Sequence, residues 1–100
     1  MNNAKLVGKE VVEISDIREW SRSFESSENR IVKQETIAGT KVSTVFLGVN
    51  HQYGEGPNLW FETMTFRGEE GGELEDRYET FEQAEAGHAV VAQRVRETGQ

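Results

Sequence analysis

The chain has 100 residues, a net charge of −7 and no cysteine, which excludes disulfides, thiol catalysis and cysteine-ligated zinc. Hydrophobic residues make up 35% of the chain. This is enough for one modest core, and no apolar run predicts a membrane-spanning helix or a secretory signal. The acidic balance argues against nucleic acid or an anionic membrane as the main partner.

The N-terminal part predicts one strand and one short helix. Residues 6–14 are rich in valine and are typical of a strand. Asp16 is a helix-capping residue, and Ile17, Trp20 and Phe24 follow at the spacing of one apolar helix stripe. We expect this stripe to pack against the core. The alternative is an exposed patch that binds a partner or forms a homodimer.

Four further strands are expected, over residues 30–37, 41–49, 59–66 and 74–79. The second of them carries apolar side chains on both faces, which is typical of a central strand. A tight turn at Gly39 joins the first two, because glycine readily takes a positive φ. Since the links between these strands are short, we expect antiparallel neighbours.

The clearest helix begins after Thr80, which is spaced to form a capping box with Gln83. One face of this helix is apolar apart from a single histidine. That face comprises Phe81, Ala84, His88, Val91, Ala92 and Val95. The helix must bury this stripe against one face of the sheet. Gly87 is a poor helix former, and its small size would let the helix approach another backbone closely.

These elements predict a single α+β domain over residues 1–100. The expected architecture is a two-layer sandwich, in which an antiparallel sheet of four to five strands carries the long C-terminal helix on one face. A short N-terminal helix completes the fold. Residues 1–28 are expected to be peripheral or mobile.

Two polar residues stand on faces that otherwise look buried. His88 lies at the centre of the helix stripe, and Glu62 lies between Trp60 and Met64 on a strand. A buried carboxylate needs a partner, so we expect Glu62 and His88 to face each other. The simplest role for His88 is a core histidine bonded to Glu62, to a threonine hydroxyl or to a backbone carbonyl. General acid–base catalysis and metal binding are the alternatives.

His51, in the loop after the central strand, would complete a set of two histidines and one carboxylate with His88 and Glu62. The spacing of these three residues matches no metal motif. A loop histidine that bonds nearby backbone is the simpler interpretation. We therefore expect no metal and no cofactor. No catalytic motif is recognisable, so the sequence favours a protein that is not an enzyme.

The strongest compositional signal is an acidic segment. Residues 67–86 hold eight acidic and two basic side chains, which account for −6 of the net charge. A solvated loop and a helix N-terminus would explain this segment. The sharper interpretation is a docking face for a basic partner, such as a nucleic-acid-binding protein. The candidate binding residues are Glu69, Glu70, Glu73, Glu75 and Asp76.

About three quarters of the chain resembles a family of small uncharacterised proteins of tailed bacteriophages and prophages. The residues that carry the resemblance are Val42-Ser43-Thr44-Val45-Phe46-Leu47-Gly48, His51, Gly56-Pro57, Phe61-Glu62-Thr63-Met64, Phe66, Arg77-Tyr78, Thr80 and Ala86-Gly87-His88, with Trp20 and Arg30-Ile31-Val32 upstream. The family has no assigned activity. The resemblance implies a viral source and the host cytoplasm as the place of action.

Three functional hypotheses follow from these observations. The first is a phage accessory protein that binds a host or phage protein stoichiometrically and acts in host takeover or against a host defence. The second is a small enzyme or metal-binding protein that uses Glu62, His88 and His51. The third is a virion or assembly component that forms homo-oligomers.

Overall fold

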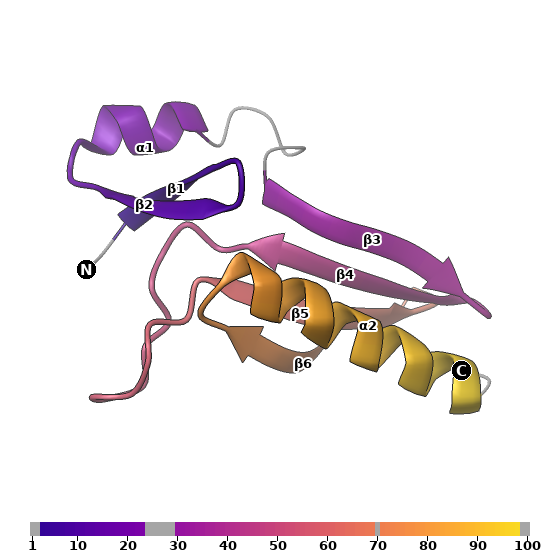
Figure 1. Cartoon of the computed structure of the whole chain (residues 1–100). Helices are drawn as coiled ribbons and strands as arrows, with labels where there is room; N and C mark the ends of the chain where they lie inside the picture. Colours follow the sequence, from indigo (N-terminus) through magenta and orange to yellow (C-terminus); the bar gives the residue numbers. More distant parts are fainter. Residues whose placement is uncertain (1–2, 24–29, 70, 99–100) are drawn as a thin grey trace.

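The computed structural model describes residues 3–23, 30–69 and 71–98 (Figure 1). In chain order, the elements are β1 (Asn3–Val7), β2 (Glu10–Ile14), α1 (Ile17–Ser23), β3 (Ile31–Ile37), β4 (Thr40–Phe46), β5 (Phe61–Arg67), β6 (Glu73–Tyr78) and α2 (Phe81–Thr98). Within the described ranges, no helix is long and apolar enough to cross a membrane.

The main sheet has four antiparallel strands in the order β3-β4-β5-β6, and α2 packs across one of its faces (Figure 1). This confirms the predicted α+β architecture. The strand predicted to be central is central. Val42, Thr44 and Phe46 of β4 are buried on the side of the sheet that α2 covers. The alternation of side chains along β4 therefore sets which residues meet the helix.

The predicted capping box forms at the start of α2. The backbone N–H of Gln83 donates to Thr80 Oγ1 at 3.1 Å, and the N–H of Thr80 donates to Gln83 Oε1 at 3.3 Å. The predicted apolar stripe is buried throughout, except for the partly buried Phe81. Gly87 does allow a close approach, but to the ring of Tyr78 and not to a backbone.

The single strand expected over residues 6–14 is wrong. The chain reverses at Gly8, where φ is +62°, and makes the β1–β2 hairpin, which forms a separate two-stranded sheet. Glycine at the first position of a two-residue loop favours this reversal. The hairpin is anchored to the end of β4, because Ala4 is fully buried and its N–H donates to the Gly48 carbonyl at 2.9 Å.

Helix α1 begins where expected, since the N–H of Arg18 donates to Asp16 Oδ1 at 2.9 Å. The expected apolar stripe is only partly realised. Ile17 is 58% exposed, whereas Trp20 is partly buried and its indole N–H donates to the Gly48 carbonyl at 2.9 Å. Phe24 lies outside the described residues. The described part of residues 1–28 is therefore attached to the end of the sheet at Gly48, by β1 and by α1.

The interior under α2 consists of two apolar clusters. The larger contains Ala4, Phe46, Trp60, Phe61, Tyr78 and Ala84. The smaller contains Val42, Val91 and Val95. Along α2, His88 lies between the residues that contribute to the two clusters. The centre of the helix–sheet interface is thus polar, with buried Thr44 and Thr63 beside the imidazole.

The turn between β3 and β4 carries a strained residue. Both of its central residues have positive φ, +50° at Ala38 and +84° at Gly39, as a type I′ hairpin turn requires. Alanine loses about 1 kcal/mol in this conformation relative to glycine or asparagine. We expect Ala38→Asn to raise the free energy of unfolding by about 0.5–1 kcal/mol in urea denaturation. An unchanged or lower midpoint would contradict this expectation.

Candidate functional site

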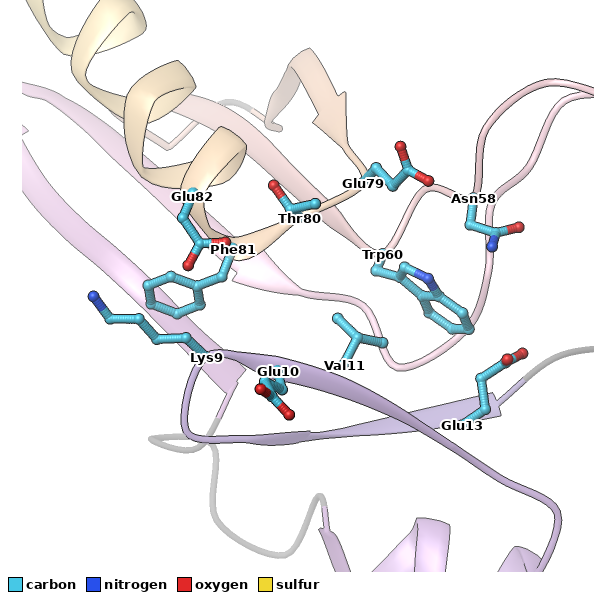
Figure 2. Close-up of a pocket in the computed structure, with 10 residues that line it drawn as sticks. All are labelled: Lys9, Glu10, Val11, Glu13, Asn58, Trp60, Glu79, Thr80, Phe81 and Glu82. Atoms are coloured by element: carbon cyan, nitrogen blue, oxygen red, sulfur yellow. The ribbon is translucent and has the colours of Figure 1, made fainter.

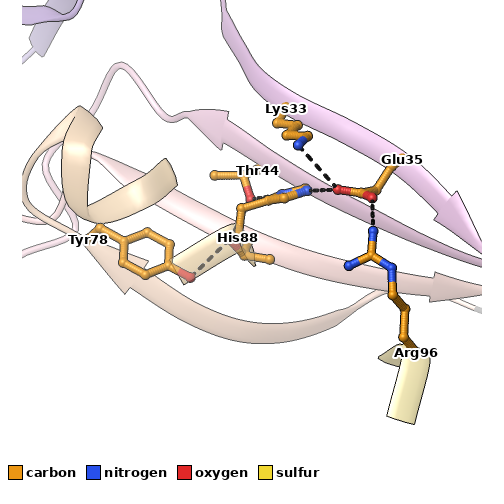
Figure 3. A network of polar contacts seen from close by, with 7 residues as sticks. Lys33, Glu35, Thr44, Tyr78, His88 and Arg96 are labelled. Carbon is orange, nitrogen blue, oxygen red and sulfur yellow. Dashed lines mark hydrogen bonds and ion pairs between the residues drawn. The ribbon is translucent and has the colours of Figure 1, made fainter. Parts of the chain in front are cut away.

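His88 is 1% exposed and bonds through both ring nitrogens (Figure 3). Its Nδ1 lies 2.7 Å from Thr44 Oγ1 on β4, and its Nε2 lies 2.7 Å from Glu35 Oε2 on β3. The helix period directs the imidazole at the sheet, and the pleat of each strand directs these two partners at the helix. His88 therefore links α2 to two neighbouring strands.

The chain of hydrogen bonds continues beneath the helix. Thr44 Oγ1 lies 2.5 Å from Thr63 Oγ1, and the Tyr78 hydroxyl donates to Thr63 Oγ1 at 3.0 Å. One arrangement of the hydroxyl and imidazole protons satisfies every group. In it, Tyr78 donates to Thr63, Thr63 donates to Thr44, and Thr44 donates to Nδ1 of His88. The Nε2–H of His88 then donates to the Glu35 carboxylate. Burial raises the pKa of Tyr78, which keeps its hydroxyl protonated as a donor.

The Glu35 end of this network reaches the surface. Arg96 donates to Glu35 Oε1 at 2.8 Å, and Lys33 Nζ lies 3.8 Å from Oε2. The hydrogen bond from His88 lowers the pKa of Glu35, and the charges of Lys33 and Arg96 act in the same direction. The carboxylate therefore stays ionised while it accepts the imidazole N–H.

A hydroxyl, an imidazole and a carboxylate in this order have the sequence of groups in a nucleophile triad. Thr44, which supplies the hydroxyl, is fully buried and is also bonded to the fully buried Thr63. A substrate has no access to that oxygen. The network therefore holds the helix on the sheet, and the interpretation of His88 as a core histidine bonded to a threonine is the one that the geometry supports.

The network predicts a specific loss of stability in acid. Because the pKa of Glu35 is lowered in the folded chain, the unfolded chain takes up its proton first. The stabilisation is complete above the ordinary value near 4.5 and is lost as the pH falls through the lower, folded value. We expect Glu35→Gln to cost about 1–2 kcal/mol at pH 7 and much less at about pH 3, in urea denaturation.

Glu55→Gln is the matched control, because Glu55 is exposed in the loop between β4 and β5 and has no ion pair among the described residues. It is expected to keep the wild-type difference in stability between the two pH values. If the free energy of unfolding of Glu35→Gln changed with pH as that of wild type does, the Glu35–His88 bond would not contribute to stability.

The expected pairing of Glu62 with His88 is wrong. Phe61, Thr63 and Thr65 of β5 are buried on the α2 side, so alternation places Glu62 on the opposite face of the sheet. There its carboxylate accepts a hydrogen bond from Arg77 Nε at 3.3 Å. Glu35 is the carboxylate that His88 binds. Glu35 lies two residues before the partly buried Ile37 in β3, and this place in the strand pattern gave no sign of the contact.

His51 does not join Glu62 or His88 in a metal site. Its side chain is exposed in the loop between β4 and β5, and its backbone N–H donates to the Leu59 carbonyl at 2.9 Å. Over residues 3–23, 30–69 and 71–98, no group of three or more carboxylates and histidines is arranged to hold a metal ion. His51 lies in a loop, Glu62 on the sheet face opposite α2, and His88 in the interior.

The acidic segment contains exposed carboxylates and one partly buried carboxylate, Glu75. Glu69, Glu73 and Asp76 are exposed. Glu75 turns under α2, where it accepts hydrogen bonds from Thr65 at 2.7 Å and from Arg94 at 2.9 Å. Glu75 is therefore not part of a docking face. Glu70 lies outside the described residues.

Further exposed carboxylates extend this surface to the start of α2. We define the acidic edge as Glu69, Glu73, Asp76, Glu79 and Glu82. It follows the β5–β6 turn, the edge strand β6 and the first turn of the helix (Figure 1). Within the described ranges, none of these five carboxylates has an ion-pair partner. Leu74, 49% exposed, lies among them.

Comparison with known proteins finds no family model, no curated protein and no solved structure that matches the chain.

Proposed function

We propose that this chain is a small accessory protein that binds a basic protein partner stoichiometrically through the acidic edge. The observation that carries the proposal is that the five carboxylates of the acidic edge are exposed and have no ion pair within the described residues. A surface of one charge sign steers a partner of the opposite sign and selects against others.

Several carboxylates outside the acidic edge are neutralised within the chain. Glu19, Glu62 and Glu75 each have a lysine or arginine within 3.3 Å. Two of the cations on or beside β6, Arg77 and Arg94, are thus engaged with Glu62 and Glu75. A basic partner would supply the missing charges, and the exposed Leu74 would supply an apolar contact at the centre of the surface.

The position of β6 at the edge of the sheet favours a partner of different charge over a second copy. An edge strand presents unpaired backbone groups that can template pairing with another strand. A self-pairing through β6 would bring Glu73 and Asp76 close to the same carboxylates of the second copy. Such like-charge contacts oppose homodimer formation at this edge.

The setting of the proposal comes from the resemblance to phage and prophage proteins. A small acidic protein made in an infected cell meets many basic host proteins that bind nucleic acid. Occupation of such a surface would block it by contact alone, without catalysis. Host takeover and protection against a host defence are both served by this mode of action.

The test is capture from a lysate of phage-infected bacteria with two matched variants as bait. Glu69→Gln/Glu73→Gln neutralises part of the acidic edge. Asp16→Asn/Glu55→Gln removes the same charge at exposed positions at the start of α1 and in the loop between β4 and β5, and asparagine keeps the capping oxygen of Asp16. We expect wild type and the second variant to retain one basic protein, identified by mass spectrometry, and the first variant to lose it. Equal retention by both variants, or retention of nothing by wild type, would contradict the proposal.

A further inference from the structure

A cleft of about 420 Å³ lies between the β1–β2 hairpin and the start of α2 (Figure 2). The hairpin lines it from Lys9 to Glu13, and Asn58 and Trp60 line it from the segment before β5. Residues 79–82 at the helix start complete the lining. The cleft adjoins the acidic edge, because Glu79 and Glu82 belong to both.

The charge of the cleft is strongly negative. Glu10, Glu13, Glu79 and Glu82 line it, and none of the four has an ion pair within the described residues. Lys9 is the one basic residue in the lining. Its Nζ lies 3.7 Å from Glu85 Oε1 and 5.4 Å from the centre of the Phe81 ring. The Trp60 end of the cleft therefore keeps its negative charge.

Trp60 supplies an independent sign that this cleft takes a ligand. The residue is 4% exposed, yet no described residue accepts a hydrogen bond from its indole N–H. In Figure 2 the indole nitrogen lies on the edge of the ring that faces away from Val11, toward Asn58 and Glu79. The indole nitrogen itself is not closed off from solvent, so its N–H is an unpaired donor in the wall of the cleft. An acceptor brought into the cleft would satisfy this donor.

The start of α2 does not turn the cleft into an anion site. The side chains of the capping box occupy its exposed donors, since Gln83 Oε1 accepts from the N–H groups of Glu79 and Thr80, and Thr80 Oγ1 accepts from the N–H of Gln83. What remains in the cleft is one unpaired donor, the Trp60 N–H, among four carboxylates. A ligand that fits carries a cation and, close to it, an oxygen acceptor.

We propose that the cleft binds an arginine side chain on an extended segment of the basic partner, which rests on the function proposed above. The guanidinium is paired by Glu13 and Glu79, which flank the Trp60 ring in Figure 2. A backbone carbonyl of the same segment accepts the Trp60 N–H. Arginine suits this place better than lysine, because its planar group presents donors to two carboxylates at once.

The two tryptophans allow a direct test by NMR on the full ¹⁵N-labelled chain. The Trp20 indole N–H is already bonded to the Gly48 carbonyl, so it is an internal reference. The probe is the blocked peptide acetyl-Gly-Arg-Gly-Gly-amide, and the same peptide with citrulline for arginine is the uncharged control. We expect the arginine peptide to shift the Trp60 indole signal and to leave that of Trp20 in place. The citrulline peptide is expected to bind at least about tenfold more weakly.

Two variants of equal charge locate the binding. Glu13→Gln/Glu79→Gln is expected to weaken binding of the arginine peptide about tenfold. Glu69→Gln/Glu73→Gln, in the β5–β6 turn, is expected to weaken it less than about twofold. The inference is overturned if the Trp60 indole does not shift, if citrulline binds equally well, or if the two variants behave alike. If the peptide shifted only the signals of residues in the β5–β6 turn, the cleft would not be the binding site, and the proposed function would still stand.

Discussion

Replacement of His88 by alanine is expected to lower the free energy of unfolding by about 3–4 kcal/mol. The change removes both hydrogen bonds of the imidazole, to Thr44 and to Glu35, at a residue that is 1% exposed. It leaves a buried hydroxyl without its acceptor and a cavity between the two apolar clusters. Urea denaturation at pH 7, followed by circular dichroism, measures the loss.

His88→Gln is the second variant, since its amide can keep one polar contact and fills most of the space. We expect it to lose about 1–2 kcal/mol less than alanine does. If alanine left the denaturation midpoint unchanged, His88 would not hold the helix on the sheet. The hydrogen-bond network would then have no structural role.

Replacement of Gly87 by alanine is expected to cost about 2–3 kcal/mol, although alanine is the better helix former by about 1 kcal/mol. A Cβ at this position would overlap with Cε1, Cζ and the hydroxyl oxygen of Tyr78. The ring would have to leave its place, and its hydrogen bond to Thr63 would be lost. The measurement is the midpoint of urea denaturation.

The matched background is Tyr78→Leu, which removes the three atoms that would overlap while keeping an apolar side chain. In that background, Gly87→Ala is expected to be neutral or to stabilise by up to about 1 kcal/mol, because only the helix propensity remains. The same loss in both backgrounds would show that contact with Tyr78 is not what requires glycine here.

Local patterns predicted the elements whose signals lie within a few residues. The capping box at Thr80 and Gln83 and the buried stripe of α2 follow from the helix period, and both are present. The same period placed His88 inside. These features depend on neighbours three or four residues away, so they can be recognised without knowledge of the fold.

Features that depend on distant contacts could not be read from the sequence. Glu35 is 53 residues from His88 in the chain, and its alignment with the imidazole depends on the position of β3 relative to the helix. Glu62 was assigned to the buried face because it alternates with Trp60. Trp60 is indeed buried, but it precedes β5, which begins at Phe61, so it does not belong to the alternation of that strand. The alternation of side chains along a strand shows which residues share a face, but not which face packs against the helix.

The N-terminal hairpin was missed for a different reason. The run of residues 6–14 is broken only by Gly8 and Lys9, which is a weaker turn signal than Asn-Gly. Its docking through Ala4 to Gly48 is again a long-range contact. The cleft arises from that docking, so no local pattern indicated a site that joins residues 9–13 to residues 79–82.

Calorimetric titration with the captured partner measures whether the chain binds a basic protein through the acidic edge, as proposed. We expect a 1:1 complex whose affinity falls steeply with salt, because exposed charges are screened. Glu69→Gln/Glu73→Gln is expected to lose at least about tenfold in affinity, and Asp16→Asn/Glu55→Gln to bind as wild type does. An affinity that is independent of salt and equal in all three proteins would contradict binding through the acidic edge.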